Sequence, residues 1–143
     1  MTNRILSFTD AADIISVQLG FNDWLNNLPL GTPGDDAIDT VYGALHLIAE
    51  HLAKNYQDAF VFFITPYPSA LTANEEYTLE DVANAVRMVA EEYGIPVLDL
   101  HALGQFELEM NTEQSDGVHP SKEFTENYTA PQIEAFIREH YGK

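Results

Sequence analysis

The sharpest chemical feature of the sequence is an aspartate three residues before a histidine, Asp116 and His119. A carboxylate at this spacing can fold back through a turn, which Gly117 makes easier, and accept a hydrogen bond from imidazole Nδ1. The carboxylate then fixes the tautomer of the imidazole, and Nε2 faces outward and can act as a general base. The alternative is a surface loop in which Asp116 and His119 only cap the following helix.

Gly20 and Asn22 are a second pair of candidate site residues. An amide side chain held at the end of a strand can donate a hydrogen bond to an oxyanion, together with the backbone N–H of Gly20. Glycine also lets the backbone approach a ligand closely. The alternative is an ordinary turn or helix-capping asparagine. No partner for His101 is evident in the sequence, and we find no metal site.

Hydrophobic patterns predict the elements that would position these groups. Strands are expected at residues 12–19, 59–65 and 95–100, and helices at residues 37–55, 78–93 and about 130–141. In the helices apolar residues recur at steps of three and four, which places Ile38 on the inner face of the first one. The second strand is a continuous apolar run, typical of a parallel sheet buried on both faces. The fold class is therefore α/β.

Local signals mark the helix ends. Thr78 and Asp81 have the spacing of a capping box, with a shorter acid than usual. Gly94 suits the left-handed position after a helix end. Pro131 falls in the first turn of the last helix, where a missing N–H costs little. These signals support the helices expected at residues 78–93 and about 130–141.

The candidate groups follow strands, and ligands of open parallel sheets bind outside the carboxyl ends of the strands. Residues 20–23, 65–68 and 115–120 should therefore lie at one edge of the sheet. Trp24 and Tyr67 belong to the same edge, where they either line a substrate cleft or cover the sheet.

Composition narrows the classes of partner. The chain has 143 residues, no cysteine, and 23 acidic against six basic residues, for a formal charge of −17. Such a surface repels phosphate backbones and anionic lipid, so nucleic acid and membrane partners are disfavoured. No apolar run is long enough to span a membrane, and residues 1–7 do not form a secretion signal. The compartment, cytoplasmic or secreted, stays open.

Two blocks of the sequence resemble those of the SGNH (GDSL-type) hydrolases. Residues 19–23, Leu-Gly-Phe-Asn-Asp, resemble the family's G-x-N-D block, and residues 116–120, Asp-Gly-Val-His-Pro, resemble its D-x-x-H-P block. The resemblance implies a flavodoxin-like three-layer α/β/α sandwich. It also implies an oxyanion hole at Gly20 and Asn22, a general base at His119 with Asp116 as its orienting partner, and no cofactor.

The family's nucleophilic serine block is not found. We therefore expect residues 1–143 to be one incomplete domain of this kind, without its first strand–helix–strand portion. The resemblance implies an ester hydrolase acting on an acyl or acetyl ester, possibly of a carbohydrate, through Ser-His-Asp chemistry in a full-length parent. This chain alone is expected to be inactive. The alternative is a non-catalytic, SGNH-like ligand-binding domain; an acidic receiver-type domain fits less well.

The missing portion also predicts self-association. In the family the strand at residues 12–19 pairs with the serine-bearing strand, so its edge should offer unpaired backbone groups here. We expect a homo-oligomer that covers this edge. The alternative is that residues 1–9 fold back over it.

Overall fold

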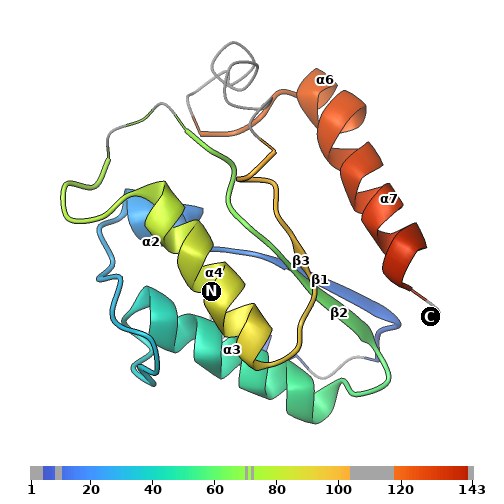
Figure 1. Ribbon diagram of the computed structural model, residues 1–143, viewed down its shortest axis with the longest axis horizontal. Coiled ribbons are helices and arrows are strands. Elements are labelled where there is room, and N and C mark those ends of the chain that lie inside the picture. The colour runs from blue at the N-terminus through green and yellow to red at the C-terminus, as the bar shows by residue number, and fades with distance from the viewer. Residues whose placement is uncertain (1–4, 9–10, 70, 72, 104–117, 142–143) are drawn as a thin grey trace.

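The computed structural model describes residues 5–8, 11–69, 71, 73–103 and 118–141. Within them the sheet has three parallel strands in the order β1 (Ile14–Gln18), β2 (Phe60–Ile64) and β3 (Val97–Leu98) (Figure 1). Ile14 lies opposite Phe60, and Phe63 lies opposite Val97. The parallel α/β sheet predicted from the sequence is confirmed, although each strand is shorter than its predicted range.

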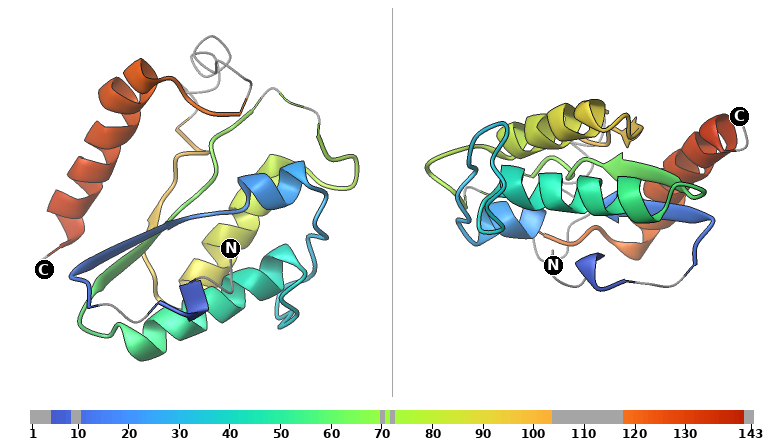
Figure 2. Two further views of the ribbon diagram at one scale, coloured as in Figure 1. Left: turned by 180° about the vertical axis from the view of Figure 1, so that it is seen from behind. Right: turned by 90° about the horizontal axis from the view of Figure 1, so that it is seen from below.

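Helices cover both faces of this sheet (Figure 2). α3 (Val41–Asn55) and α4 (Leu79–Glu92) pack on one face, and α7 (Ala130–His140) packs on the other. Alternate side chains of a strand point to opposite faces. Phe63 accordingly lies in the core beneath α3 and α4, whereas Phe62 lies in the core beneath α7, and both are fully buried. The three-layer, flavodoxin-like arrangement is confirmed.

α3 begins later than the sequence pattern predicts. Thr40 is its N-cap, and its Oγ1 accepts a hydrogen bond of 3.0 Å from the Gly43 N–H. The Thr40 N–H and hydroxyl both donate to the Ala37 carbonyl, so the chain makes a turn before the helix. Ile38 therefore lies outside α3 and is 45% exposed, and its predicted place on the inner face is wrong.

The capping box of α4 is confirmed. Thr78 Oγ1 accepts from the Asp81 N–H, and Asp81 Oδ2 accepts from the Thr78 N–H at 2.7 Å. The Thr78 hydroxyl also donates to Asp81 Oδ2 at 2.7 Å. The hydrogen bonds from this hydroxyl and from the Thr78 N–H hold the pKa of the Asp81 carboxyl below its usual value, because they favour the ionised form. Gly94 follows the helix with φ 64°, as the sequence predicts.

Replacing Thr78 with alanine should lower the free energy of unfolding by about 1 kcal/mol, because the amides at the start of α4 lose their acceptor. Thr78→Ser, which keeps the hydroxyl, is the control and should stay close to the parent protein. Urea denaturation measures both variants. Equal losses for alanine and serine would show that the methyl group of Thr78, not its hydroxyl, is what matters.

The last helix is part of a longer helical run. α6 (Lys122–Phe124), a π-helical turn (Thr125–Thr129) and α7 follow one another without a break. Pro131 lies inside this run, where it has no N–H to donate to the preceding turn. The wider hydrogen bond from the Ala130 N–H to the Thr125 carbonyl is the adjustment that lets the helix pass this point. The predicted start of the last helix near residue 130 is confirmed, although α7 continues the run from α6 and does not start from a loop.

Among the described residues no helix combines the length and apolar character required to cross a bilayer.

Candidate active site

One pocket lies at the carboxyl ends of the strands and brings together residues from three parts of the chain. Its volume is about 630 Å³, and Gly20, Asn22, Tyr67 and His119 all line it. Gly20 and Asn22 come from the end of β1, Tyr67 follows β2, and His119 precedes α6. Of the four candidate catalytic residues predicted from the sequence, Asp116 lies outside the described part of the chain, as does Gly117 beside it.

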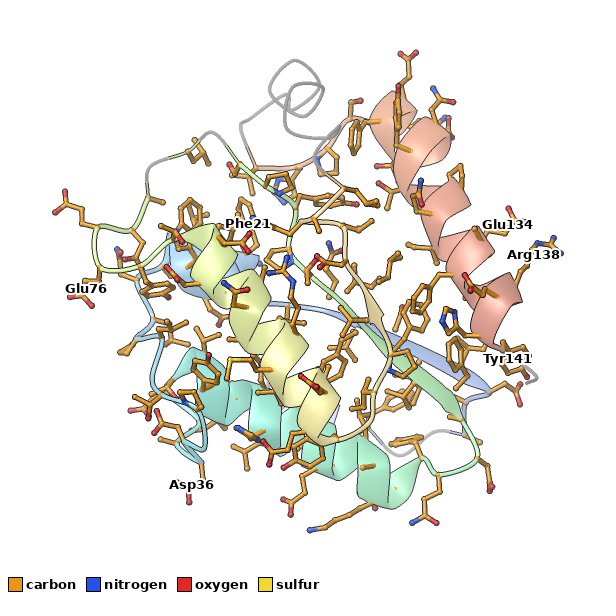
Figure 3. The ribbon with its side chains drawn as sticks, viewed as in Figure 1. Phe21, Asp36, Glu76, Glu134, Arg138 and Tyr141 are labelled. Atoms are coloured by element: carbon orange, nitrogen blue, oxygen red, sulfur yellow. The ribbon has the colours of Figure 1, made fainter. Side chains whose placement is uncertain are left out.

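A short helix that the sequence pattern did not predict carries the first of these groups. α2 (Phe21–Leu25) starts directly after β1, with Gly20 as its N-cap at φ 101°. Asn22 is the second residue of α2 and is exposed at the pocket. Phe21, labelled in Figure 3, also lines the pocket, and its ring packs edge-on to Trp24 at 5.6 Å. The apolar residues at positions 21, 24 and 25 were the available signal for this helix.

Gly20 has a packing role beside any chemical one. A Cβ at this position would lie 2.4 Å from Val82 Cγ1 in α4. Its positive φ is a conformation that residues with a Cβ rarely adopt. α2 and α4 therefore approach each other as closely as they do only because residue 20 is glycine.

Trp24 is part of the core and not of the pocket lining. It is 4% exposed, and its indole N–H donates to the Tyr77 carbonyl at 3.2 Å. Of the two roles that the sequence left open, lining a substrate cleft or covering the sheet, Trp24 has the second. Tyr67, by contrast, does line the pocket.

Tyr67 and Pro66 form the pocket wall that follows β2. The Tyr67 hydroxyl lies 2.8 Å from Thr129 Oγ1, which ties this wall to the helical run on the other face of the sheet. Burial raises the pKa of the Tyr67 hydroxyl, and hydrogen bonds with Thr129 and Gln18 offset part of that rise. Tyr67 thus stays protonated at neutral pH, so it is not a phenolate nucleophile.

A buried polar network supports the segment that carries Pro66 and Tyr67. Thr65 is fully buried, and its hydroxyl donates to Asp99 Oδ1 at 3.0 Å while accepting from the His101 N–H at 2.9 Å. Arg87 in α4 donates to the Asp99 carboxylate through Nε at 2.7 Å and through Nη2 at 3.1 Å. The network links the ends of β2 and β3 to α4, next to the pocket.

The charge of Asp99 depends on this network. Partial burial alone would raise the pKa of the Asp99 carboxyl, but hydrogen bonds from Arg87, Ala102 and Thr65 outweigh it and hold the pKa below its usual value. The same contact raises the pKa of Arg87. Asp99 is therefore ionised and paired at neutral pH.

His101 bridges the wall and α4, although the sequence shows no partner for it. Its Nδ1 lies 3.1 Å from the Pro66 carbonyl oxygen and its Nε2 lies 2.8 Å from Glu80 Oε2. Both ring nitrogens are engaged by these two contacts, so His101 acts as a structural link between the wall and α4.

The chemical character of the pocket lining is neutral to acidic. Among the described lining residues Asp23 is the one carboxylate, and no lysine, arginine, serine or threonine is present. The apolar part includes Leu19, Phe21 and Leu28. No group of three or more potential metal ligands occurs within the described part of the chain. The described lining therefore offers amide, imidazole and apolar surface, and no serine or threonine hydroxyl is among its residues.

A parallel sheet with a pocket at the carboxyl ends of its strands defines the class of open α/β proteins, many of which are enzymes. Within that class, the family model of the GDSL-like lipases/acylhydrolases matches residues 3–124. The chain belongs to this family. A comparison with curated protein sequences finds no match.

Solved structures share the fold of this chain. A protein from Lactobacillus plantarum is 25% identical with a TM-score of 0.90, over 99% of this chain and 74% of that one. A possible lipase from Chitinophaga pinensis is 22% identical with a TM-score of 0.82, over 96% and 77% respectively. A catalytic mutant of an acetylxylan esterase from Geobacillus stearothermophilus is 21% identical with a TM-score of 0.56, over 89% and 58%. The last two share the fold.

Proposed function

We propose that this chain provides the general base and the oxyanion donors of a GDSL-type ester hydrolase. The observation that carries the proposal is that Gly20, Asn22 and His119, which are up to 99 positions apart (119 − 20) in sequence, line one pocket. Reaction at an ester carbonyl requires a base and hydrogen-bond donors that converge on one atom. Membership of the family implies a small-molecule ester as substrate.

In this proposal each residue has one role. His119 Nε2 removes a proton from the attacking nucleophile, and Asp116 accepts the hydrogen bond from Nδ1–H that orients the ring. The side-chain amide of Asn22 and the backbone N–H of Gly20 stabilise the oxyanion that forms when the carbonyl is attacked. A serine attacks in the family's chemistry, but the described pocket lining contains none. We therefore propose that this chain by itself forms no acyl-enzyme.

The pocket favours an uncharged substrate. Asp23 and the net charge of −17 repel anions, and no lysine or arginine is among the described lining residues. Apolar side chains next to the amides of Gln18, Asn22 and Asn26 suit a short acyl group on an alcohol rich in hydroxyls. An acetylated carbohydrate has this character, and one structural relative is an acetylxylan esterase.

The absence of a covalent intermediate is the first testable consequence. Incubation with a fluorophosphonate probe should leave every serine unlabelled, and p-nitrophenyl acetate should give no burst of p-nitrophenol. Intact-mass spectrometry measures the labelling, with an active serine hydrolase as positive control. Stoichiometric labelling of a serine would contradict the proposal that this chain lacks a nucleophile, and peptide mapping would identify that residue.

An external nucleophile can distinguish a hydrolase site from a ligand-binding domain. Hydroxylamine attacks p-nitrophenyl acetate to give acetohydroxamate and p-nitrophenol, and the chain should accelerate this acyl transfer if its base and oxyanion donors are in place. His119→Gln and Asn22→Ala should each lose most of the acceleration. Asn55→Ala, at an exposed amide at the end of α3 and outside this pocket, and His140→Gln are the matched controls and should retain it. No acceleration, or equal loss in the controls, would favour the non-catalytic binding domain.

A further inference from the structure

His119 belongs to a segment whose position depends on α6. The residue is exposed at the pocket and lies just before Ser121, the N-cap of α6. Ser121 Oγ accepts a hydrogen bond of 3.0 Å from the Phe124 N–H, which starts the helix. In Figure 1, α6 lies at the end of the sheet where the chain leaves β2. The contacts that hold α6 to that chain therefore also place His119.

Phe124 makes the first of these contacts. Its side chain is 1% exposed and packs against Tyr67, with ring centroids 6.2 Å apart and ring planes at 79°. An edge-to-face pair has a preferred geometry, so it orients the two rings as well as burying them. Because Tyr67 follows β2, this contact fixes the start of the helical run to the sheet.

Thr129 makes the second contact. It is buried in the π-helical turn, and its Oγ1 lies 2.8 Å from the Tyr67 hydroxyl oxygen. Thr129 is not among the described residues that line the pocket, whereas Tyr67 is. Any effect of the Thr129 hydroxyl on the pocket must therefore pass through Tyr67.

The π-helical turn brings these two contacts to one side of the run. Phe124 and Thr129 are five positions apart (129 − 124). In a regular α-helix, residues at this separation point about 140° away from each other, because each residue turns by about 100°. A π-helical turn joins residues five apart by a hydrogen bond, so these lie nearly above one another. Phe124 and Thr129 can therefore contact the same tyrosine, one at its ring and the other at its hydroxyl.

The Tyr67 hydroxyl also joins the run to the end of β1. It has a hydrogen bond with the side chain of Gln18, and Gln18 and Gly20 both line the pocket. A phenol donates one hydrogen bond and can accept another, so tyrosine serves both Thr129 and Gln18, whereas phenylalanine would serve neither. The oxyanion side of the pocket and the segment that carries the base thus meet at one hydroxyl.

We propose that Tyr67 is a positioning residue, which holds the segment that carries His119 against the ends of β1 and β2. The inference rests on the proposed function, in which the base and the oxyanion donors act on one carbonyl. Tyr67 acts on the segment through Phe124 and Thr129, and on the end of β1 through Gln18. Such groups need a closely fixed geometry, since a displacement of about 1 Å can lower a rate by about 100-fold.

Thr129 allows a test that leaves the pocket lining intact. Thr129→Val keeps the shape of the side chain without its hydroxyl, and Tyr67→Phe removes the other hydroxyl of the pair. In the hydroxylamine assay both should lower kcat by roughly ten-fold with little change in KM, because the base is displaced and the substrate contacts remain. Thr129→Ser keeps the hydroxyl and should recover the parental kcat. Tyr141→Phe, at a tyrosine that is 47% exposed at the end of α7, is the matched control for loss of a phenol.

A direct contact between the Tyr67 hydroxyl and the substrate predicts a different pattern. Tyr67→Phe would then raise KM, and Thr129→Val would behave like the parent protein. That pattern would overturn the inference.

A distance measurement tests the positioning without any activity. The chain has no cysteine, so spin labels can be attached at Glu123→Cys in α6 and Glu50→Cys in α3, both at exposed positions. The distribution of distances between the labels should broaden or shift in Thr129→Val and in Tyr67→Phe, and should keep its parental form in Thr129→Ser. Circular dichroism shows whether each variant is folded.

The two measurements separate the two proposals. If the parent protein gives no acyl transfer, the proposed function fails, and the distance measurement alone decides whether Tyr67 holds the segment. Distances that stay parental in both Tyr67→Phe and Thr129→Val would overturn the inference, whatever the activity.

Discussion

Replacement of Gly20 with alanine should lower the free energy of unfolding by about 3 kcal/mol. Two effects add at this position. Alanine at φ 101° carries a backbone cost of about 1–2 kcal/mol. The new Cβ would also overlap Val82 Cγ1, which would be 2.4 Å away, and overpacking of a buried contact costs about 1–3 kcal/mol. Urea denaturation monitored by Trp24 fluorescence measures the sum.

Two variants separate these effects. Gly94 also has a positive φ, at 64°, but a Cβ there would have nothing within 4 Å. Gly94→Ala should therefore show the backbone cost alone. In a Val82→Ala background, Gly20→Ala should likewise lower the free energy of unfolding by the backbone cost alone, because the overlap with Val82 Cγ1 is removed. If Gly20→Ala cost no more than Gly94→Ala, the close approach of α2 and α4 at Gly20 would not be what requires glycine.

Replacement of Asp99 with asparagine should cost about 2 kcal/mol at neutral pH, because charged hydrogen bonds to Arg87 and Thr65 are weakened or lost. The loss should depend on pH. The folded pKa of Asp99 is lowered, so its contribution is fully present above the pKa of an unfolded aspartate, about 3.9, and is lost as the pH falls through the folded value.

Denaturation at several pH values tests this assignment. The difference in unfolding free energy between the parent protein and Asp99→Asn should stay constant from pH 7 to about 4 and shrink as the pH is lowered further, toward the folded pKa of Asp99. Asp58→Asn, at an exposed carboxylate before β2, changes the net charge equally and should show little difference at any pH. A difference for Asp99→Asn that did not shrink at low pH would mean that the charge of Asp99 does not stabilise the fold.

The contacts behind these two predictions join residues that are far apart in the sequence. The sequence suggested only that glycine at position 20 lets the backbone approach a ligand. The positive φ of Gly20, and its contact with Val82, which is 62 positions away (82 − 20), were not predicted. Asp99 and Arg87 belong to different elements, and no spacing rule connects them. The link through His101 was missed for the same reason, since its partners follow β2 and begin α4.

What the sequence by itself determined is local or periodic. The apolar run of β2, the Thr78 capping box and the left-handed Gly94 are properties of a few consecutive residues, and all are confirmed. The expectation that Gly20, Asn22 and His119 meet followed from parallel topology, because carboxyl ends of parallel strands share one edge. Their catalytic roles, and that of Asp116, stay predictions.

The tertiary structure decided what depends on contacts between distant segments. Helix α2 is short enough that its packing through Trp24, and not its propensity, holds it in place. The start of α3 was set by the turn at Ala37 and not by the apolar pattern that included Ile38. Periodicity reports which face of an element is buried, whereas the polar network around Thr65 depends on the distances between elements that only the folded chain establishes.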